Sequence, residues 1–289
     1  PQYLFNYHYF QKQYENDIVK NNDKKKTKQL KKLVTPFILR RNKKEVLTEL
    51  PDKIEQNIIL PFNDEEEKLY VANLAKANKE LQELYDLEGS DKMQILKLLT
   101  RLRQLCLEPR LVYDNIDQPS SKLKACMELI KTMQENKQKV LLFSSFTSVL
   151  DLIAEECQKA GITYYMLTGS TNKEDRRELV SRFQKDDTTL FLISLKAGGT
   201  GLNLTSAEVV IHFDPWWNVS AQNQATDRAY RIGQKNNVQV FNLVMKDSVE
   251  EKIIELQKRK KELADMFVEN NSGGLSQMSK EDILSLFTM

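Results

Sequence analysis

The chain has 289 residues, and its 43 Lys and Arg against 41 Asp and Glu leave a net charge of +2, which excludes a uniformly basic nucleic-acid coat but permits a local patch. The length predicts about two domains. Two His and three well-separated Cys allow neither a zinc ligand set nor a disulfide framework, so a reducing compartment fits best. No apolar run approaches the ~18 residues of a membrane span. Because the chain begins at Pro1 without an initiator Met, we expect a fragment of a longer protein.

The first segment with a strong charge bias spans residues 20–44. It carries eleven Lys and Arg against one acid, Asp23, which gives a local charge of +10. A run such as 24–26 is equally typical of a solvated helix face. However, Arg40 and Arg41 directly follow the apolar stretch 36–39. If that stretch packs against the protein, the two basic side chains are held in place, which favours contacts to phosphate.

The first 135 residues predict mainly helix, over 64–88, 91–105 and, at their end, 122–136. Asn63 is the candidate N-cap of the first helix, with acidic residues in its first turn. The run 58–60 followed by the acids 64–67 resembles a strand that ends in metal-binding carboxylates. Pro61 would break such a strand, and the acids suit a helix N-terminus, so we predict no metal site.

From Lys139 onward, short apolar runs alternate with helical stretches. Strands without polar alternation, separated by helices, indicate a parallel sheet covered on both faces, with ligands at the carboxyl ends of its strands. We therefore predict a doubly wound α/β domain over 139–246. Its expected strands are 140–143, 163–167, 190–193, 209–213 and 238–244, and the expected helices are 147–160, 173–184, 219–230 and 248–268.

A glycine-rich turn follows the strand at 190–193. Its glycines (Gly198, Gly199 and Gly201) allow close backbone approach and free N–H groups for an anion, and Lys196 adds a positive charge. None of the nine glycines of the chain precedes a Lys, so the sequence contains no G-x-x-x-x-G-K phosphate loop.

Two further segments follow later strands. The adjacent Trp216 and Trp217 would point to opposite faces of an extended backbone, one into the core and one outward, unless both pack under the following helix. Arg228 and Arg231 are three residues apart, so on a helix stopped by Gly233 they would share one face. Such a pair suits a polyphosphate, although paired arginines are also common on surface helices.

Taken together these segments resemble the SWI/SNF family of helicase-like ATPases. Residues 224–234 (QATDRAYRIGQ) resemble that family's motif six, and 195–204 (LKAGGTGLNL) its motif five. The stretch that joins these two motifs in the family is resembled by residues 214–218, motif four by 139–153, and the phosphate-contacting segment after it by 167–171. Outside the sheet, the start of the family's helical insertion is resembled by 4–18, its arginine linker by 36–55 and its closing helix by 248–263.

The resemblance implies a RecA-like second motor lobe over 136–247, a helical protrusion over 1–135 and a closing helix and tail over 248–289. The parent would hydrolyse ATP with Mg²⁺ and move along double-stranded DNA without separating its strands. By resemblance Arg228 and Arg231 would be arginine fingers, and Gln224, Gly199 and Gly201 would line the nucleotide cleft. The implied DNA contacts are Lys196, Gly169, Ser170, Trp217, Asn218, Arg40 and Arg41.

Four positions depart from the family's pattern: Tyr230 replaces a common His, Val219 a Pro, Ser145 a Gln and Thr168 an Asp. The motifs of the first lobe are absent. We therefore expect the nucleotide and Mg²⁺ to be bound mainly by an N-terminal RecA-like lobe of the same parent. We also expect this chain to be inactive without that lobe, and monomeric.

Two alternatives remain open at this point. One is a lobe of a strand-separating or RNA helicase, against which the linker arginines and the helical insertion argue. The other is a non-catalytic DNA-binding module that uses the basic patch, against which the paired arginines argue. The ending at 279–287 resembles that of simpler members and favours a prokaryotic, cytoplasmic and nucleoid-associated protein, whereas a eukaryotic source would imply the nucleus.

Overall fold

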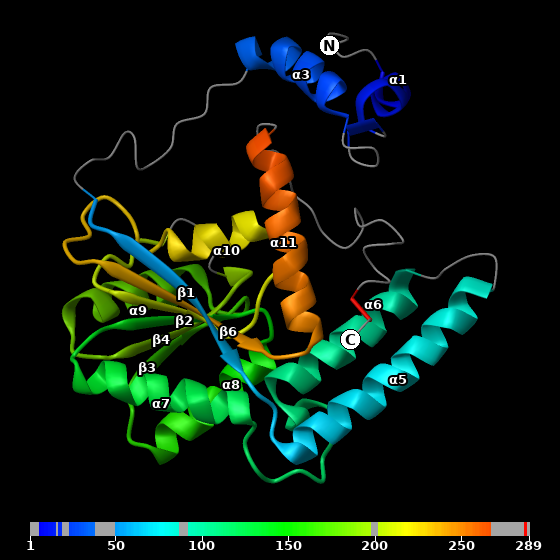
Figure 1. The fold of residues 1–289 in the computed structure, drawn as a ribbon. Helices are drawn as coiled ribbons and strands as arrows, with labels where there is room; N and C mark the ends of the chain where they lie inside the picture. Colours follow the sequence, from blue (N-terminus) through cyan, green and yellow to red (C-terminus); the bar gives the residue numbers. More distant parts are fainter. Residues whose placement is uncertain are drawn as a thin grey trace. The chain divides into compact units, whose positions relative to one another are not determined.

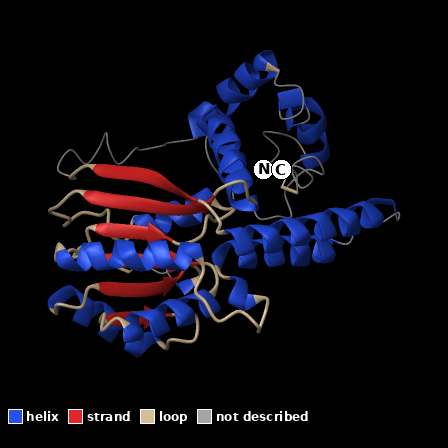
Figure 2. Cartoon of the chain, turned by 60° about the horizontal axis from the view of Figure 1, so that its bottom comes forward, coloured by secondary structure: helices blue, strands red, loops and turns tan. Residues whose placement is uncertain are grey.

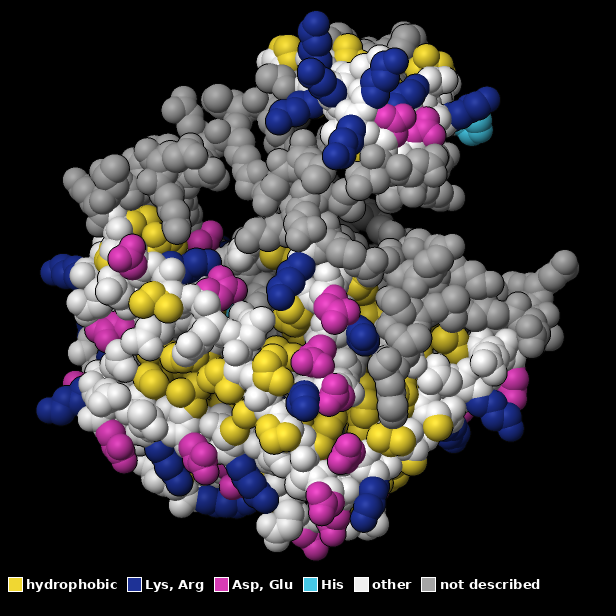
Figure 3. All heavy atoms as spheres, viewed as in Figure 1, with side chains coloured by type: hydrophobic (Ala, Val, Ile, Leu, Met, Phe, Trp, Pro, Cys, Tyr) yellow, Lys and Arg dark blue, Asp and Glu magenta, His cyan; other side chains and the backbone are white. Residues whose placement is uncertain are grey.

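The computed structural model describes residues 6–15, 17–18, 23–37, 50–86, 92–197, 202–266 and 286–287. The chain divides into a smaller unit, residues 1–48 with 258–271, and a larger one, 49–257 with 272–289. The elements of residues 1–48 are α1 (Tyr7–Phe10), the π-helix Gln11–Glu15, α3 (Lys24–Val34) and the 3-10 turn Thr35–Phe37. The Asp23 carboxylate accepts hydrogen bonds from the N–H groups of Lys25 and Lys26, which starts α3. Lys and Arg side chains gather on this unit, whereas both charge signs mix on the larger one (Figure 3).

The larger unit is built on one six-stranded sheet in which every neighbouring pair is parallel (Figure 1). The order of the strands is β1-β6-β5-β2-β4-β3. This architecture confirms the predicted α/β class. The strands are β1 (Lys53–Leu60), β2 (Val140–Ser144), β3 (Tyr164–Leu167), β4 (Leu190–Ser194), β5 (Val209–His212) and β6 (Val238–Met245).

Helices cover both faces of this sheet (Figure 2). Alternate residues of β2 enter two separate apolar cores, because successive side chains of a strand point to opposite faces. Val140 and Leu142 pack with α7 and α8, while Leu141 and Phe143 pack with residues of α9 and α10. These helices are α7 (Ser121–Glu135), α8 (Thr147–Lys159), α9 (Lys173–Lys185) and α10 (Val219–Thr226).

The edge strand β1 was not among the predicted strands. Lys53–Leu60 pairs along its whole length with β6, and the Lys246 N–H donates to the Leu60 carbonyl at 2.8 Å. Pro61 ends this strand instead of preventing it. An edge strand exposes one side, so its polar and apolar residues mix, and the helical reading of the first 135 residues is wrong here.

The helical part of the larger unit is a hairpin of α5 (Asp64–Asp86) and α6 (Lys92–Leu107), which lie side by side in Figures 1 and 2. Asn63 caps α5 as predicted: its side-chain oxygen accepts from the N–H groups of Glu65 and Glu66, and Glu66 accepts from the Asn63 N–H. A third apolar core joins this hairpin to α11 (Val249–Met266) and to the C-terminal Leu286 and Phe287.

Candidate functional site

The carboxyl ends of three neighbouring strands bring the predicted segments together. The Ser144 hydroxyl at the end of β2 donates to the Asp214 carboxylate after β5 at 2.7 Å. The Leu195 N–H after β4 donates to the Ser144 carbonyl at 2.9 Å. The segments that follow β2, β4 and β5 are therefore contiguous, at the sheet edge where parallel α/β folds bind ligands.

The glycine-rich segment after β4 lies partly within the described residues. Gly199 and Gly201 lie outside the described residues, and Lys196 is exposed. Leu202 and Leu204 are buried and anchor the end of the segment. The Leu204 N–H donates to the Arg228 carbonyl at 3.0 Å. The backbone thus joins the end of the glycine-rich segment to the first of the paired arginines.

The paired arginines lie beyond a helix, not on one. α10 ends at Thr226, four residues earlier than predicted, and Arg228 and Arg231 follow in a series of turns. Asp227 is the C-cap, and Gly233 adopts a φ of +101°, which suits glycine. Arg228 and Arg231 therefore do not share a helical face, and the helix predicted over 219–230 is wrong at its end.

The two guanidinium groups still act on each other. Arg228 is half-buried, and its pKa is lowered by burial and then by the nearby positive charge of Arg231. Its Nε is buried and has no hydrogen-bond partner among the described residues. A guanidinium held under these conditions is stabilised by a bound anion, because an anion would satisfy both the unpaired donor and the excess charge.

A buried glutamine fixes this arginine turn. The Gln234 amide donates to the carbonyls of Ala207 and Ala229 at 2.8 and 3.2 Å, and its oxygen accepts from the next two backbone N–H groups. Gln234 was not among the predicted site residues. Gln224, predicted at the nucleotide cleft, is exposed on α10.

Gly169 and Ser170 form an exposed turn after β3, closed by the bond from the Thr168 N–H to the Thr171 hydroxyl. Beside it, a groove lies between the first turns of α9 and residues 202–203 of the glycine-rich segment. Its lining includes Lys173, Arg176 and Arg177. The structure thus adds a basic groove next to the predicted DNA-contacting turn.

The tryptophan segment after β5 follows neither predicted arrangement fully. Trp216 packs against the core on the α9 and α10 side, and Trp217 against the core of the helical hairpin. Both are partly buried. The Asn218 side-chain oxygen caps α10 by accepting from the Ala221 N–H at 3.3 Å, so this residue fixes the start of the helix.

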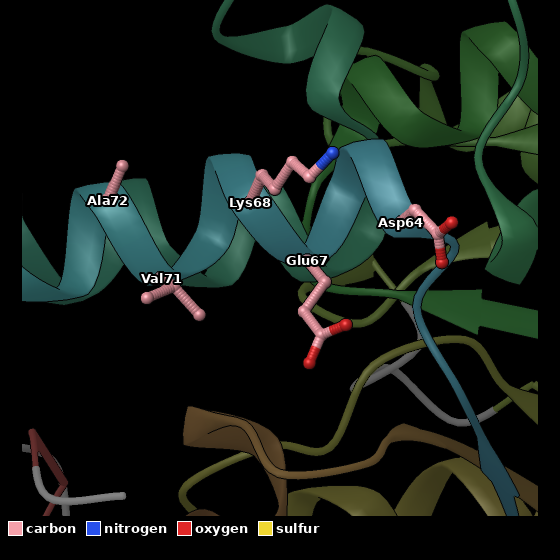
Figure 4. A pocket seen from close by; sticks show the side chains of 5 residues that line it. All are labelled: Asp64, Glu67, Lys68, Val71 and Ala72. Atoms are coloured by element: carbon pink, nitrogen blue, oxygen red, sulfur yellow. The ribbon is translucent and has the colours of Figure 1, made fainter.

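The remaining predicted positions carry no observed site. Arg40 and Arg41 lie outside the described residues. A hollow along α5 is lined by described residues of that one helix, among them Glu67 and Val71, whose side chains are drawn in Figure 4. Within the described ranges, no three His, Cys, Asp or Glu side chains are grouped to hold a metal ion, and no helix has the length and hydropathy to cross a membrane.

Comparison with known proteins identifies the family. Residues 121–233 match the helicase conserved C-terminal domain, and residues 1–111 match the SNF2-related domain. An uncharacterized ATP-dependent helicase of Mycoplasma pneumoniae is 37% identical over 99% of the chain. A Sulfolobus solfataricus SWI2/SNF2 ATPase core in complex with dsDNA is 31% identical, with a TM-score of 0.67, over 99% of this chain and 61% of that one.

The chain belongs to the SWI/SNF family. It spans 27% of the Mycoplasma pneumoniae protein, and 31% of a putative ATP-dependent helicase/translocase of Bacillus subtilis that is 35% identical over 97% of the chain. The chain thus spans less than a third of the length of these curated relatives.

Within this SWI/SNF domain, a polar network that was not predicted holds the tryptophan segment to the helices. The Gln222 oxygen accepts from the Trp216 N–H at 3.2 Å, and its amide donates to Asn242 on β6 at 2.9 Å. The Gln257 amide on α11 donates to the Trp216 carbonyl. No local pattern marks these residues, because their partners lie up to 41 residues away in sequence.

Proposed function

We propose that this chain is the C-terminal motor lobe of an ATP-dependent double-stranded DNA translocase of the SWI/SNF type. The observation that carries the proposal is the half-buried Arg228 beside Arg231, whose Nε has no partner in the described part of the chain and whose carbonyl bonds the end of the glycine-rich segment. Relatives named ATP-dependent helicases and a neighbour solved with dsDNA support it.

In this proposal the arginines act as fingers on ATP. ATP, when bound with Mg²⁺, supplies the phosphoryl group whose transfer to water releases the energy for movement. Arg228 and Arg231 would meet the charge that develops on that group, while Gln224, Gly199 and Gly201 would line the same cleft. The N-terminal RecA-like lobe of the same parent would bind most of the nucleotide and the metal, so the chain alone would be inactive.

This chain also exposes an apolar side chain that the first lobe could cover. Ile232, next to Arg231, is 70% exposed, and a large apolar side chain beside two cations fits a position that closes against another protein part. We infer that the first lobe closes there when nucleotide binds, within a monomeric protein.

Double-stranded DNA would run over the turn at Gly169 and Ser170, the exposed Lys196 and the tryptophan segment with Trp217 and Asn218. Arg40 and Arg41 would add contacts from the linker. The basic groove at the start of α9 lies next to this path, which supports a backbone-directed and sequence-independent interface. The bacterial relatives favour a cytoplasmic, nucleoid-associated protein.

The arginine assignment is tested in the parent that contains both lobes. Arg228→Ala or Arg231→Ala should reduce DNA-stimulated ATP hydrolysis by roughly 10³-fold or more, because an arginine finger contributes about 10³–10⁵ in rate. The measurement is steady-state phosphate release with and without duplex DNA.

The matched control is Arg182→Ala on α9, an exposed arginine paired with Glu178. That variant should hydrolyse ATP at the normal rate. Turnover that survives both finger substitutions would refute the assignment, and displacement of a strand from a duplex by the parent would favour the strand-separating alternative.

A further inference from the structure

A buried arginine from the helical hairpin reaches the tryptophan segment. Arg103 on α6 is 6% exposed, although arginine is seldom this buried without a partner. Its Nη2 donates to the Asp214 carboxylate at 2.8 Å, to the Ser145 hydroxyl at 3.0 Å and to the Pro215 carbonyl at 3.4 Å. These acceptors lie at the carboxyl ends of β2 and β5, so one side chain joins the hairpin to that edge of the sheet.

Three aromatic rings enclose the same guanidinium. Its central carbon lies 5.0 Å from the ring centroid of Phe146 and 5.5 Å from those of Trp216 and Trp217. The faces of such rings attract a cation, and the attraction is stronger where water is excluded, as it is around this buried side chain. Both tryptophans of the chain therefore share one cation.

The Asp214 carboxylate, which accepts from Arg103, also accepts three further hydrogen bonds. Asp214 is 1% exposed, and beyond Arg103 it accepts from the Ser144 hydroxyl and from both the N–H and the hydroxyl of Ser145. A carboxylate with this many donors is held in one orientation. Because Trp216 and Trp217 follow Asp214 by two and three residues, fixing Asp214 fixes the backbone that leads to them.

We propose that Arg103 is a positioning residue for DNA binding, which orients Trp216 and Trp217 through Asp214 and ties that segment to the helical hairpin. The inference rests on the proposed function, in which Trp217 and Asn218 face the duplex. Arg103 itself is too buried to contact phosphate. Its removal should therefore change how the tryptophan segment is held without removing a phosphate contact.

The test compares Arg103→Met, which keeps the length of the side chain, with Arg101→Met as the matched control. Arg101 lies on the same helix and bonds Asn73 and Tyr113 instead of the tryptophan segment. Because Trp216 and Trp217 are the only tryptophans, their emission and its quenching by acrylamide report on this segment alone. Affinity for a labelled duplex is measured on the same proteins over a range of salt concentrations.

We expect Arg103→Met to shift the tryptophan emission to longer wavelength, to raise acrylamide quenching and to weaken DNA binding about tenfold. The slope of log Kd against log salt should stay the same, since the slope counts phosphate contacts. Arg101→Met should alter none of these. If the Met variant does not fold, Arg103→Lys keeps the charge but loses the planar stacking, and should show the same changes to a smaller degree.

Unchanged emission, unchanged affinity or a slope smaller by about one unit would each overturn the positioning role, the last because it would make Arg103 a phosphate contact. A wild-type chain that binds no duplex at any salt concentration would instead refute the proposed function on which the inference rests.

Discussion

At the scale of single residues, His212 is a titratable group buried within the sheet. It is 1% exposed, its Nε2 shares a hydrogen bond with the Thr226 hydroxyl at 2.9 Å, and its ring stacks on Phe143. Burial lowers the pKa of His212 to about 4, although Glu55 and Asp214 oppose the shift. The native protein therefore holds this imidazole neutral where the unfolded chain would protonate it.

This difference predicts a loss of stability in acid. The pKa of His212 is lower in the folded state than the 6.5 of the unfolded chain, so the unfolded state binds more protons between these values. The free energy of unfolding should fall as pH drops from about 6.5 to about 4, by on the order of 3 kcal/mol from this residue. Urea unfolding at several pH values measures it.

His212→Gln, which cannot titrate, should remove that part of the pH dependence, and His8→Gln at the exposed second histidine is the matched control. Equal slopes for wild type and His212→Gln would contradict the prediction.

At the scale of elements, the C-terminal residues anchor the helical hairpin. Leu286 and Phe287 are each 1% exposed and pack in one core with Tyr70 and Leu74 of α5. The Asn78 amide donates to the Phe287 carbonyl at 2.9 Å. This hydrogen bond joins residues that are 209 positions apart in sequence, so it ties Phe287 to α5.

Replacing the Phe287 side chain by a smaller one should destabilise the fold. Phe287→Ala removes a buried ring and leaves a cavity, which typically costs about 3–5 kcal/mol. Met93→Ala on α6, where the side chain is 60% exposed, should cost less than about 0.5 kcal/mol. Urea unfolding of both variants tests this, and equal stabilities would show that the terminal residues do not support the core.

At the scale of the whole molecule, DNA binding should depend on a local basic groove and not on the net charge of +2. The double substitution Lys173→Ala with Arg177→Ala removes two exposed cations from the groove at the start of α9. It should weaken duplex binding and reduce the slope of log Kd against log salt by about two units, since each phosphate contact contributes about 0.9. The slope is measured by titration with a labelled duplex.

Arg182→Ala, further along the same helix, controls for the loss of one positive charge outside the groove and should leave the slope unchanged. If the double variant keeps the wild-type slope of log Kd against log salt, the DNA path lies elsewhere on the lobe.

The candidate site was predictable in part. Residue type and strand order were enough to place Arg228 and Arg231 after β5 and the glycine-rich segment after β4, since parallel strands end at a common edge. The end of α10 was not predictable, because Thr226 and Asp227 continue an acceptable helical pattern and the bond from Leu204 to Arg228 that accompanies the turn is tertiary. The edge strand β1 was not predicted, because its polar and apolar residues mix and because Pro61, which ends the strand, was interpreted as a residue that breaks it.

By itself, the sequence determined the parallel α/β class, most strand and helix positions, and the absence of a phosphate loop, because these follow from local periodicity and from residue identity. Only the tertiary structure decided which polar groups meet. The Arg103–Asp214 pair spans 111 residues, and no local pattern marks it. A buried charge is costly unless it is paired, and only the packing of the core decides which residue lies close enough to pair with it.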